Sequence, residues 1–136
     1  FLPAGKVIVS QDTNGRGEDV SYRSKGYDIF NENLNLVVLV NNGSASASEI
    51  LAGALQEHGK AVVVGENTFG KGSVQELVNI TPDTSLKVTI ARWLTPNGNS
   101  ISEGGLVPDV FIKQTEEEIE AGEDTQLEKA IEVVRE

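Results

Sequence analysis

The chain has 136 residues, a formal net charge of −10 and no cysteine. The missing thiols exclude disulfides, thiolate metal sites and a cysteine nucleophile, and the negative charge argues against binding the phosphates of nucleic acid. A single histidine, His58, makes a histidine-rich metal site implausible. No apolar run approaches the roughly 18 residues that a membrane-spanning helix needs. A length of 136 residues suits one domain with its own core.

The first part of the chain predicts short strands. Residues 6–10 read as a strand, and residues 11–33 are polar and glycine-containing, with alternation only around 20–23. That stretch predicts a loop with a short hairpin. Residues 36–40 form a continuous apolar run, which is typical of a strand covered on both faces in a parallel sheet.

A helix is predicted from about Ser46, where the period of the pattern changes. Apolar residues repeat at i, i+4 between Ile50 and Leu55, and Gly59 suits the position just beyond a helix end. Residues 61–64 predict a second buried strand. Strand, helix and strand make one βαβ unit, which should be right-handed.

Alternation beyond Gly72 predicts two further strands, at residues 73–80 and 86–93, joined by a turn-rich segment. In the second strand we expect a core-facing set of Leu86, Val88 and Ile90.

The last third predicts a turn at 95–98, a short strand at 110–112 and an exposed acidic stretch at 116–120. An amphipathic helix should follow, beginning at Thr125 with Glu128 as its capping-box partner. Its apolar stripe comprises Leu127, Ala130, Ile131 and Val134.

The first chemically suggestive segment spans residues 42–49, at the junction of a buried strand and a helix. The free N–H groups of a helix N-terminus can stabilise an oxyanion, so a serine placed there can serve as a nucleophile. The pattern alone does not choose among Ser44, Ser46 and Ser48. Ser46 with Glu49 three residues later is also a plain capping box.

The second segment, residues 68–75, follows the next strand and so should lie near the first. Lys71 stands between two glycines, and in an extended chain Gln75 would share its face. A serine nucleophile needs a base, and a lysine can act only when neutral, which requires its pKa to fall by about three units through burial. Gln75 could orient the amine without adding charge. The alternatives are a solvated lysine and a phosphate-binding loop from Gly65 to Lys71, which lacks the Ser or Thr expected at Gly72.

Four motifs carry a resemblance to a known family. Residues 43–50 (GSASASEI) and 65–75 (GENTFGKGSVQ) closely resemble the C-terminal-processing, or tail-specific, serine proteases. Residues 91–98 (ARWLTPNG) and 105–109 (GLVPD) are similar to the same family, in the same order along the chain.

The resemblance implies particular roles for four residues. Ser46 matches the nucleophile, Lys71 the general base, and Gln75 the residue that orients the lysine. Ala47 follows the nucleophile and would supply one oxyanion N–H. No metal or other cofactor is implied.

The resemblance also implies an α/β fold of the ClpP/crotonase type, with a βαβ core, additional antiparallel strands and a C-terminal helix. Residues 1–136 would then be part of the catalytic domain, without its N-terminal part or a PDZ domain. Expected partners are protein or peptide substrates recognised at their C-terminal tails, with homo-oligomers possible, in an extracytoplasmic compartment. The alternative is an inactive, self-associating structural fragment.

Overall fold

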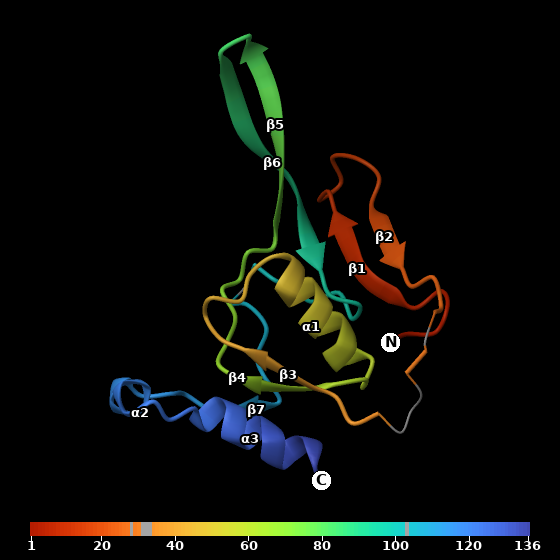
Figure 1. The fold of residues 1–136 in the computed structure, drawn as a ribbon. Coiled ribbons are helices and arrows are strands. Elements are labelled where there is room, and N and C mark those ends of the chain that lie inside the picture. Colours follow the sequence, from red (N-terminus) through yellow and green to blue (C-terminus); the bar gives the residue numbers. More distant parts are fainter. Residues whose placement is uncertain (28, 31–33, 103) are drawn as a thin grey trace.

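The computed structural model describes residues 1–27, 29, 30, 34–102 and 104–136, shown in Figure 1. The described residues form a four-stranded sheet in the order β2-β1-β6-β5 and a three-stranded sheet in the order β3-β4-β7. The elements are β1 (Val7–Asp12), β2 (Val20–Arg23), β3 (Val37–Val40), α1 (Ala47–Glu57), β4 (Val62–Gly65), β5 (Ser73–Thr81), β6 (Thr84–Leu94), β7 (Val110–Phe111), α2 (Glu116–Ala121) and α3 (Thr125–Val134).

The three-stranded sheet confirms the predicted βαβ unit. Strands β3 and β4 are parallel and adjacent, with Val37 opposite Val62, and α1 connects them. Figure 1 shows α1 on one side of these strands and α3 on the other. Helices on both sides account for the continuous apolar runs of these strands, although Leu39 and Val62 stay partly exposed.

The core lies between α1 and the parallel sheet. Val63 and Ala52 are fully buried, and they cluster with Val40 and Leu106. Gly65, at the end of β4, has φ 131°, and a Cβ there would lie 1.9 Å from the Val40 carbonyl oxygen. The neighbouring strands therefore approach so closely that only glycine fits.

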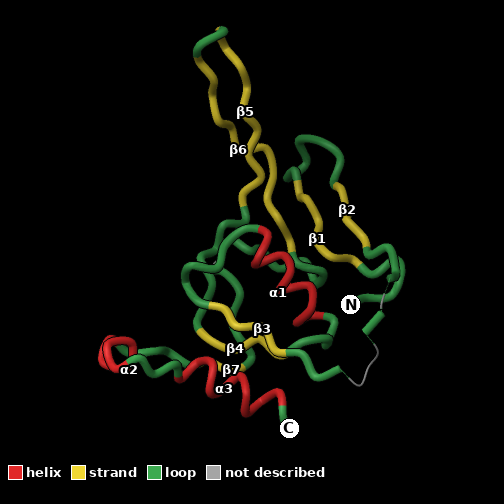
Figure 2. The backbone as a smooth tube through the Cα atoms, in the orientation of Figure 1, coloured by secondary structure: helices red, strands yellow, loops and turns green. Residues whose placement is uncertain are grey.

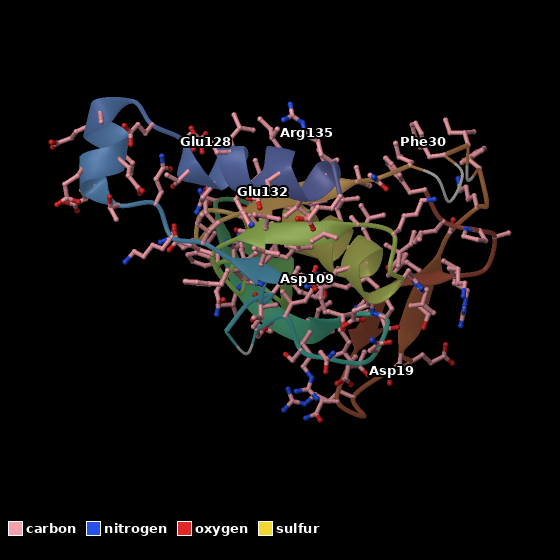
Figure 3. All side chains as sticks on the ribbon, turned by 90° about the horizontal axis from the view of Figure 1, so that it is seen from below. Asp19, Phe30, Asp109, Glu128, Glu132 and Arg135 are labelled. Carbon is pink, nitrogen blue, oxygen red and sulfur yellow. The ribbon has the colours of Figure 1, made fainter. Side chains whose placement is uncertain are left out.

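Asp109, labelled in Figure 3, holds the chain beside this sheet through its carboxylate. It accepts hydrogen bonds from the Val63 backbone N–H at 2.7 Å and from the Gln56 side-chain amide at 3.0 Å. It thus connects β4, α1 and the start of β7, which explains an aspartate directly after Pro108.

The predicted core face of β6 is wrong. Leu86 is 55% exposed and Ile90 is 39% exposed, while Val88 is half-buried. Strands β5 and β6 pair as an antiparallel hairpin that projects away from the helices, as Figure 2 shows. Only the end of β6 near Leu94 pairs with β1, so among the described residues no second layer covers the outer part of the hairpin.

The C-terminal region differs from the prediction in an additional helix and in the cap of the last one. The acidic stretch forms α2, whose N-cap is Thr115, and Glu118 completes its capping box. Helix α3 is capped by Asp124, whose carboxylate accepts the Leu127 N–H at 2.9 Å, so Thr125 is its first residue and not its cap. Asp and Thr are both good N-cap residues, and only the backbone course decides between neighbours.

The apolar stripe of α3 is covered in part. Ala130 is buried and Val134 half-buried, whereas Leu127 and Ile131 remain exposed. In the part of the chain that the structure describes, no helix is long and apolar enough to cross a membrane.

Candidate active site

Ser46 occupies the sharp turn between β3 and α1. Its backbone has φ 54° and ψ −116°, a conformation that side-chain-bearing residues seldom adopt. Such strain costs about 1–3 kcal/mol and is typical of functional sites, where the surrounding structure enforces it. Ser46 is half-buried, at the N-cap position of the helix.

The fully buried carboxylate of Glu49 holds this turn in place. One of its oxygens, Oε2, accepts the Ser46 backbone N–H at 2.8 Å, which is the glutamate half of the expected capping box. The same oxygen accepts the Lys71 backbone N–H at 3.0 Å. The two amide nitrogens are thus at most about 6 Å apart, and Glu49 connects the two predicted segments directly.

The other carboxylate oxygen of Glu49, Oε1, binds the same loop. It accepts the Thr68 hydroxyl at 2.5 Å and the Gly70 N–H at 2.6 Å. A further bond, from the Phe69 N–H to the Ser44 carbonyl at 2.9 Å, also joins the two segments. Four donors on one carboxylate satisfy a buried charge that would otherwise be costly.

The glycines that flank Lys71 make a close backbone contact possible. A Cβ on Gly70, which has φ 84°, would lie 3.0 Å from the Gly105 nitrogen, and one on Gly72 would lie 2.6 Å from the Ser102 nitrogen. The lysine loop therefore packs against Ile101, Ser102, Gly104 and Gly105. This packing, more than chain flexibility, accounts for the two glycines.

The side chains of Lys71 and Gln75 are exposed. Among the described residues, the Lys71 amine makes no hydrogen bond or ion pair with Ser46, Gln75 or any other group. Lys71 lies two residues before β5 begins, so it is outside the strand whose alternation was to align it with Gln75. The structure thus brings the backbones of the two segments together, without closing a Ser46–Lys71–Gln75 side-chain network.

The Ala47 N–H, predicted to be an oxyanion donor, lies at the N-terminus of α1. Ala47 is the first residue of α1, and within the described part of the chain its N–H donates to no acceptor. The N-terminal N–H groups of a helix lack intrahelical partners and carry partial positive charge. Negative charge beside Ser46 would be stabilised there.

The structure also bears on a phosphate-binding loop, on the single histidine and on a metal site. The segment from Gly65 to Lys71 leads into strand β5, and no helix follows whose N-terminus could cradle phosphate. His58 is partly buried at the end of α1, where its Nε2 lies 2.7 Å from the Val7 carbonyl oxygen. No group of three or more His, Asp or Glu side chains that could hold a metal gathers among the described residues.

Thr68 is a site residue that the sequence reasoning missed. It is 5% exposed, and its hydroxyl donates to Glu49 while accepting the Leu106 N–H at 2.7 Å. Glu49 was foreseen only as a local cap. The sequence did hold one indication of their importance: Glu49 and Thr68 both lie inside the family motifs, close to Ser46 and Lys71.

Comparison with known proteins places these features in a family. The model of peptidase family S41 matches residues 1–112. The carboxy-terminal-processing protease of Bartonella bacilliformis is 40% identical over 129 residues, which cover 93% of this chain and 29% of that protein. The carboxyl-terminal-processing protease of Synechocystis sp. is 37% identical over 137 residues, covering 98% of this chain and 31% of that protein.

Solved structures agree with this placement. The photosystem II D1 C-terminal processing protease superposes with a TM-score of 0.71 at 40% identity, over 82% of this chain and 28% of that chain. A structure from Parabacteroides merdae, at 22% identity and a TM-score of 0.75, shows likeness of fold alone over 98% of this chain and 44% of that one. The chain thus spans about three tenths of the length of the curated relatives it matches. With the family model covering most of its residues, the chain belongs to peptidase family S41.

Proposed function

We propose that the protein is a serine endopeptidase that cleaves proteins near their C-terminal tails, with Ser46 as nucleophile and Lys71 as general base. The observation that carries this proposal is the strained Ser46 turn, bound through the buried Glu49 carboxylate to the backbone of Lys71. Membership of family S41 and the names of the relatives support the reaction class.

The proposed reaction has two halves. Neutral Lys71 takes the proton of the Ser46 hydroxyl as Oγ attacks the scissile carbonyl carbon, and the Ala47 N–H stabilises the resulting oxyanion. The intermediate collapses, the C–N bond breaks, and the Lys71 ammonium delivers its proton to the leaving amine. Water, deprotonated by Lys71, then attacks the acyl-enzyme, and Ser46 leaves with its proton restored.

The Lys71 side chain is exposed, so the proposed reaction requires that its amine become covered. A lysine base needs an environment that disfavours its charge, and Gln75 is proposed to orient it there. The chain spans about three tenths of the relatives' length, so in this proposal segments outside the 136 residues, or the bound substrate, cover the amine. The proposed whole is a ClpP/crotonase-like catalytic domain that works with a PDZ domain in an extracytoplasmic compartment, with homo-oligomers possible.

The test uses a fluorophosphonate probe, which labels activated serines covalently. The natural full-length protein and the 136-residue chain are both treated with the probe, alongside Ser46→Ala, Lys71→Ala and the matched control Ser48→Ala. Labelling and peptide hydrolysis by the full-length protein should disappear in Ser46→Ala and Lys71→Ala and persist in Ser48→Ala. Turnover retained by Ser46→Ala would overturn the assignment.

A second candidate is self-association of the chain, favoured by the apolar residues that the hairpin exposes. Leu77 is 62% exposed, Ile80 64% and Leu86 55%. Exposed apolar patches often mark interaction surfaces. Light scattering should then show a size that grows with concentration, and a strict monomer over a wide concentration range would refute it.

A further inference from the structure

Three of the four family motifs meet at one buried hydroxyl. Thr68, in the lysine-bearing motif, donates to Glu49 of the serine motif at 2.5 Å. Its hydroxyl accepts the backbone N–H of Leu106, in the motif of residues 105–109, at 2.7 Å, and the Thr68 N–H donates to the Leu106 carbonyl at 3.1 Å. The hydroxyl is therefore satisfied both as donor and as acceptor.

This arrangement limits how Glu49 can lie. Each of its two oxygens accepts two bonds, one pair from Ser46 and Lys71 and the other from Thr68 and Gly70. Thr68 supplies the only side-chain donor among these four, and the other three are backbone N–H groups. Without the Thr68 hydroxyl, the Oε1 end of the carboxylate would rely on Gly70 alone among the described donors, so the carboxylate could rotate.

We propose that Thr68 is a positioning residue that, through the Glu49 carboxylate, sets the spacing between the Ser46 turn and the Lys71 loop. The inference rests on the proposed function, because it assigns Thr68 to the Ser46–Lys71 reaction. The Thr68 hydroxyl is bound to Glu49 and to the Leu106 N–H, so it acts on the reacting groups through Glu49. Its contact with Leu106 also ties this spacing to the segment 104–106, where Gly105 lies against the lysine loop.

The chain contains a matched control for this proposal at the other end of α1. Thr95 is 4% exposed, donates to the Glu57 carboxylate at 2.7 Å and accepts the Asn99 N–H at 3.2 Å. Thr68→Val and Thr95→Val therefore each remove a threonine hydroxyl that donates one hydrogen bond to a carboxylate and accepts one from a backbone N–H. Only the first touches the carboxylate that binds Ser46 and Lys71.

The experiment measures the rate of fluorophosphonate labelling of the natural full-length protein over a range of probe concentrations. This series gives the maximal inactivation rate and the affinity for the probe separately. We expect Thr68→Val to lower the maximal inactivation rate by about 10²-fold with little change in probe affinity, because a misplacement of about 1 Å has that effect. Thr68→Ser should restore most of the rate, because it keeps the hydroxyl. Thr95→Val should leave the rate close to that of the wild type, and the melting temperatures of both variants are measured so that rates are compared at matched folded fraction.

Equal rates in Thr68→Val and Thr95→Val, at matched folded fraction, would overturn the positioning role. So would a failure of Thr68→Ser to restore the rate. Ser46→Ala is run in the same series: labelling that persists in that variant refutes the proposed function itself, a result separate from any outcome at Thr68. If Thr68→Val does not fold, Thr68→Ala and Thr95→Ala replace the valine pair under the same criteria.

Discussion

Helix α1 carries a carboxylate near each end, and each one holds a loop in place. Near the N-terminus, fully buried Glu49 binds the Ser46 turn and residues 68–71. At the C-terminus, half-buried Glu57 accepts the Thr95 hydroxyl, the Asn97 N–H and the Asn99 side-chain amide, and so holds the turn of residues 95–99. The chemistry is nearly the same at both ends, yet the connected segments differ.

The difference lies in what each carboxylate joins. Glu57 binds one turn and leaves part of its surface to water, which can replace a lost bond. Glu49 joins two separate segments in a site closed to water, where every donor depends on it. The same residue type is therefore a local fastening at one end and the junction of the candidate active site at the other.

The largest expected effect comes from changing each carboxylate to its amide. Glu49→Gln turns an NH₂ group towards donors that need an acceptor, and should lower the free energy of unfolding by about 3 kcal/mol or more. Glu57→Gln should cost only about 1 kcal/mol, because it can keep its oxygen towards Thr95 and Asn99 while water serves Asn97. Urea unfolding of the 136-residue chain measures both, and equal losses would break the distinction between the two ends.

Alanine in the two loops should give the next largest difference. Gly70 and Gly98 have φ of 84° and 86°, but a Cβ on Gly70 would press on the Gly105 backbone, whereas nothing lies within 4 Å of one on Gly98. Gly98→Ala should therefore cost about 1–2 kcal/mol from the backbone conformation alone. Gly70→Ala should cost more by urea unfolding, and also reduce labelling at Ser46; similar values would mean that the Gly70 contact relaxes freely.

The hairpin β5–β6 offers a contrast to both ends of α1. Ile80 is 64% exposed near its tip, so Ile80→Ser should change the free energy of unfolding by less than about 0.5 kcal/mol. Val63→Ala, in the fully buried centre of β4, should cost about 2 kcal/mol or more. A large thermal destabilisation by Ile80→Ser would indicate that the exposed hairpin face is covered in solution, as self-association requires.

The smallest effect concerns a third carboxylate, on the exposed end of β1. The Asn14 backbone N–H, and next the Arg92 guanidinium at 2.7 Å, lower the pKa of Asp12 below its ordinary value. A lowered carboxyl pKa contributes stability above the unfolded-state pKa of about 4, and that contribution is lost as the pH falls through the folded-state value. Comparing Asp12→Asn with the wild type by thermal unfolding from pH 6 to pH 2 should show a small difference that vanishes at low pH. A difference independent of pH would contradict this origin.

Local patterns were enough to predict most elements. The apolar runs that became β3 and β4, the i, i+4 spacing of α1 and the glycine that ends it depend on residues close in sequence, so the prediction was accurate. The motifs around Ser46 and Lys71 also indicated which two segments should meet. The roles of Ser46, Ala47, Lys71 and Gln75 stay predictions, because no contact in the structure tests the chemistry.

Only the tertiary structure decided what covers a residue and what binds it. The alternation in β6 was read correctly as a strand, but Leu86 and Ile90 are exposed because the described chain places no layer over the hairpin. Glu49 read as a local cap, yet three of its four donors lie 19 to 22 residues further along the chain. Short-range patterns determine backbone conformation through sterics and local hydrogen bonds, whereas burial and long-range partners depend on which segments the fold brings together.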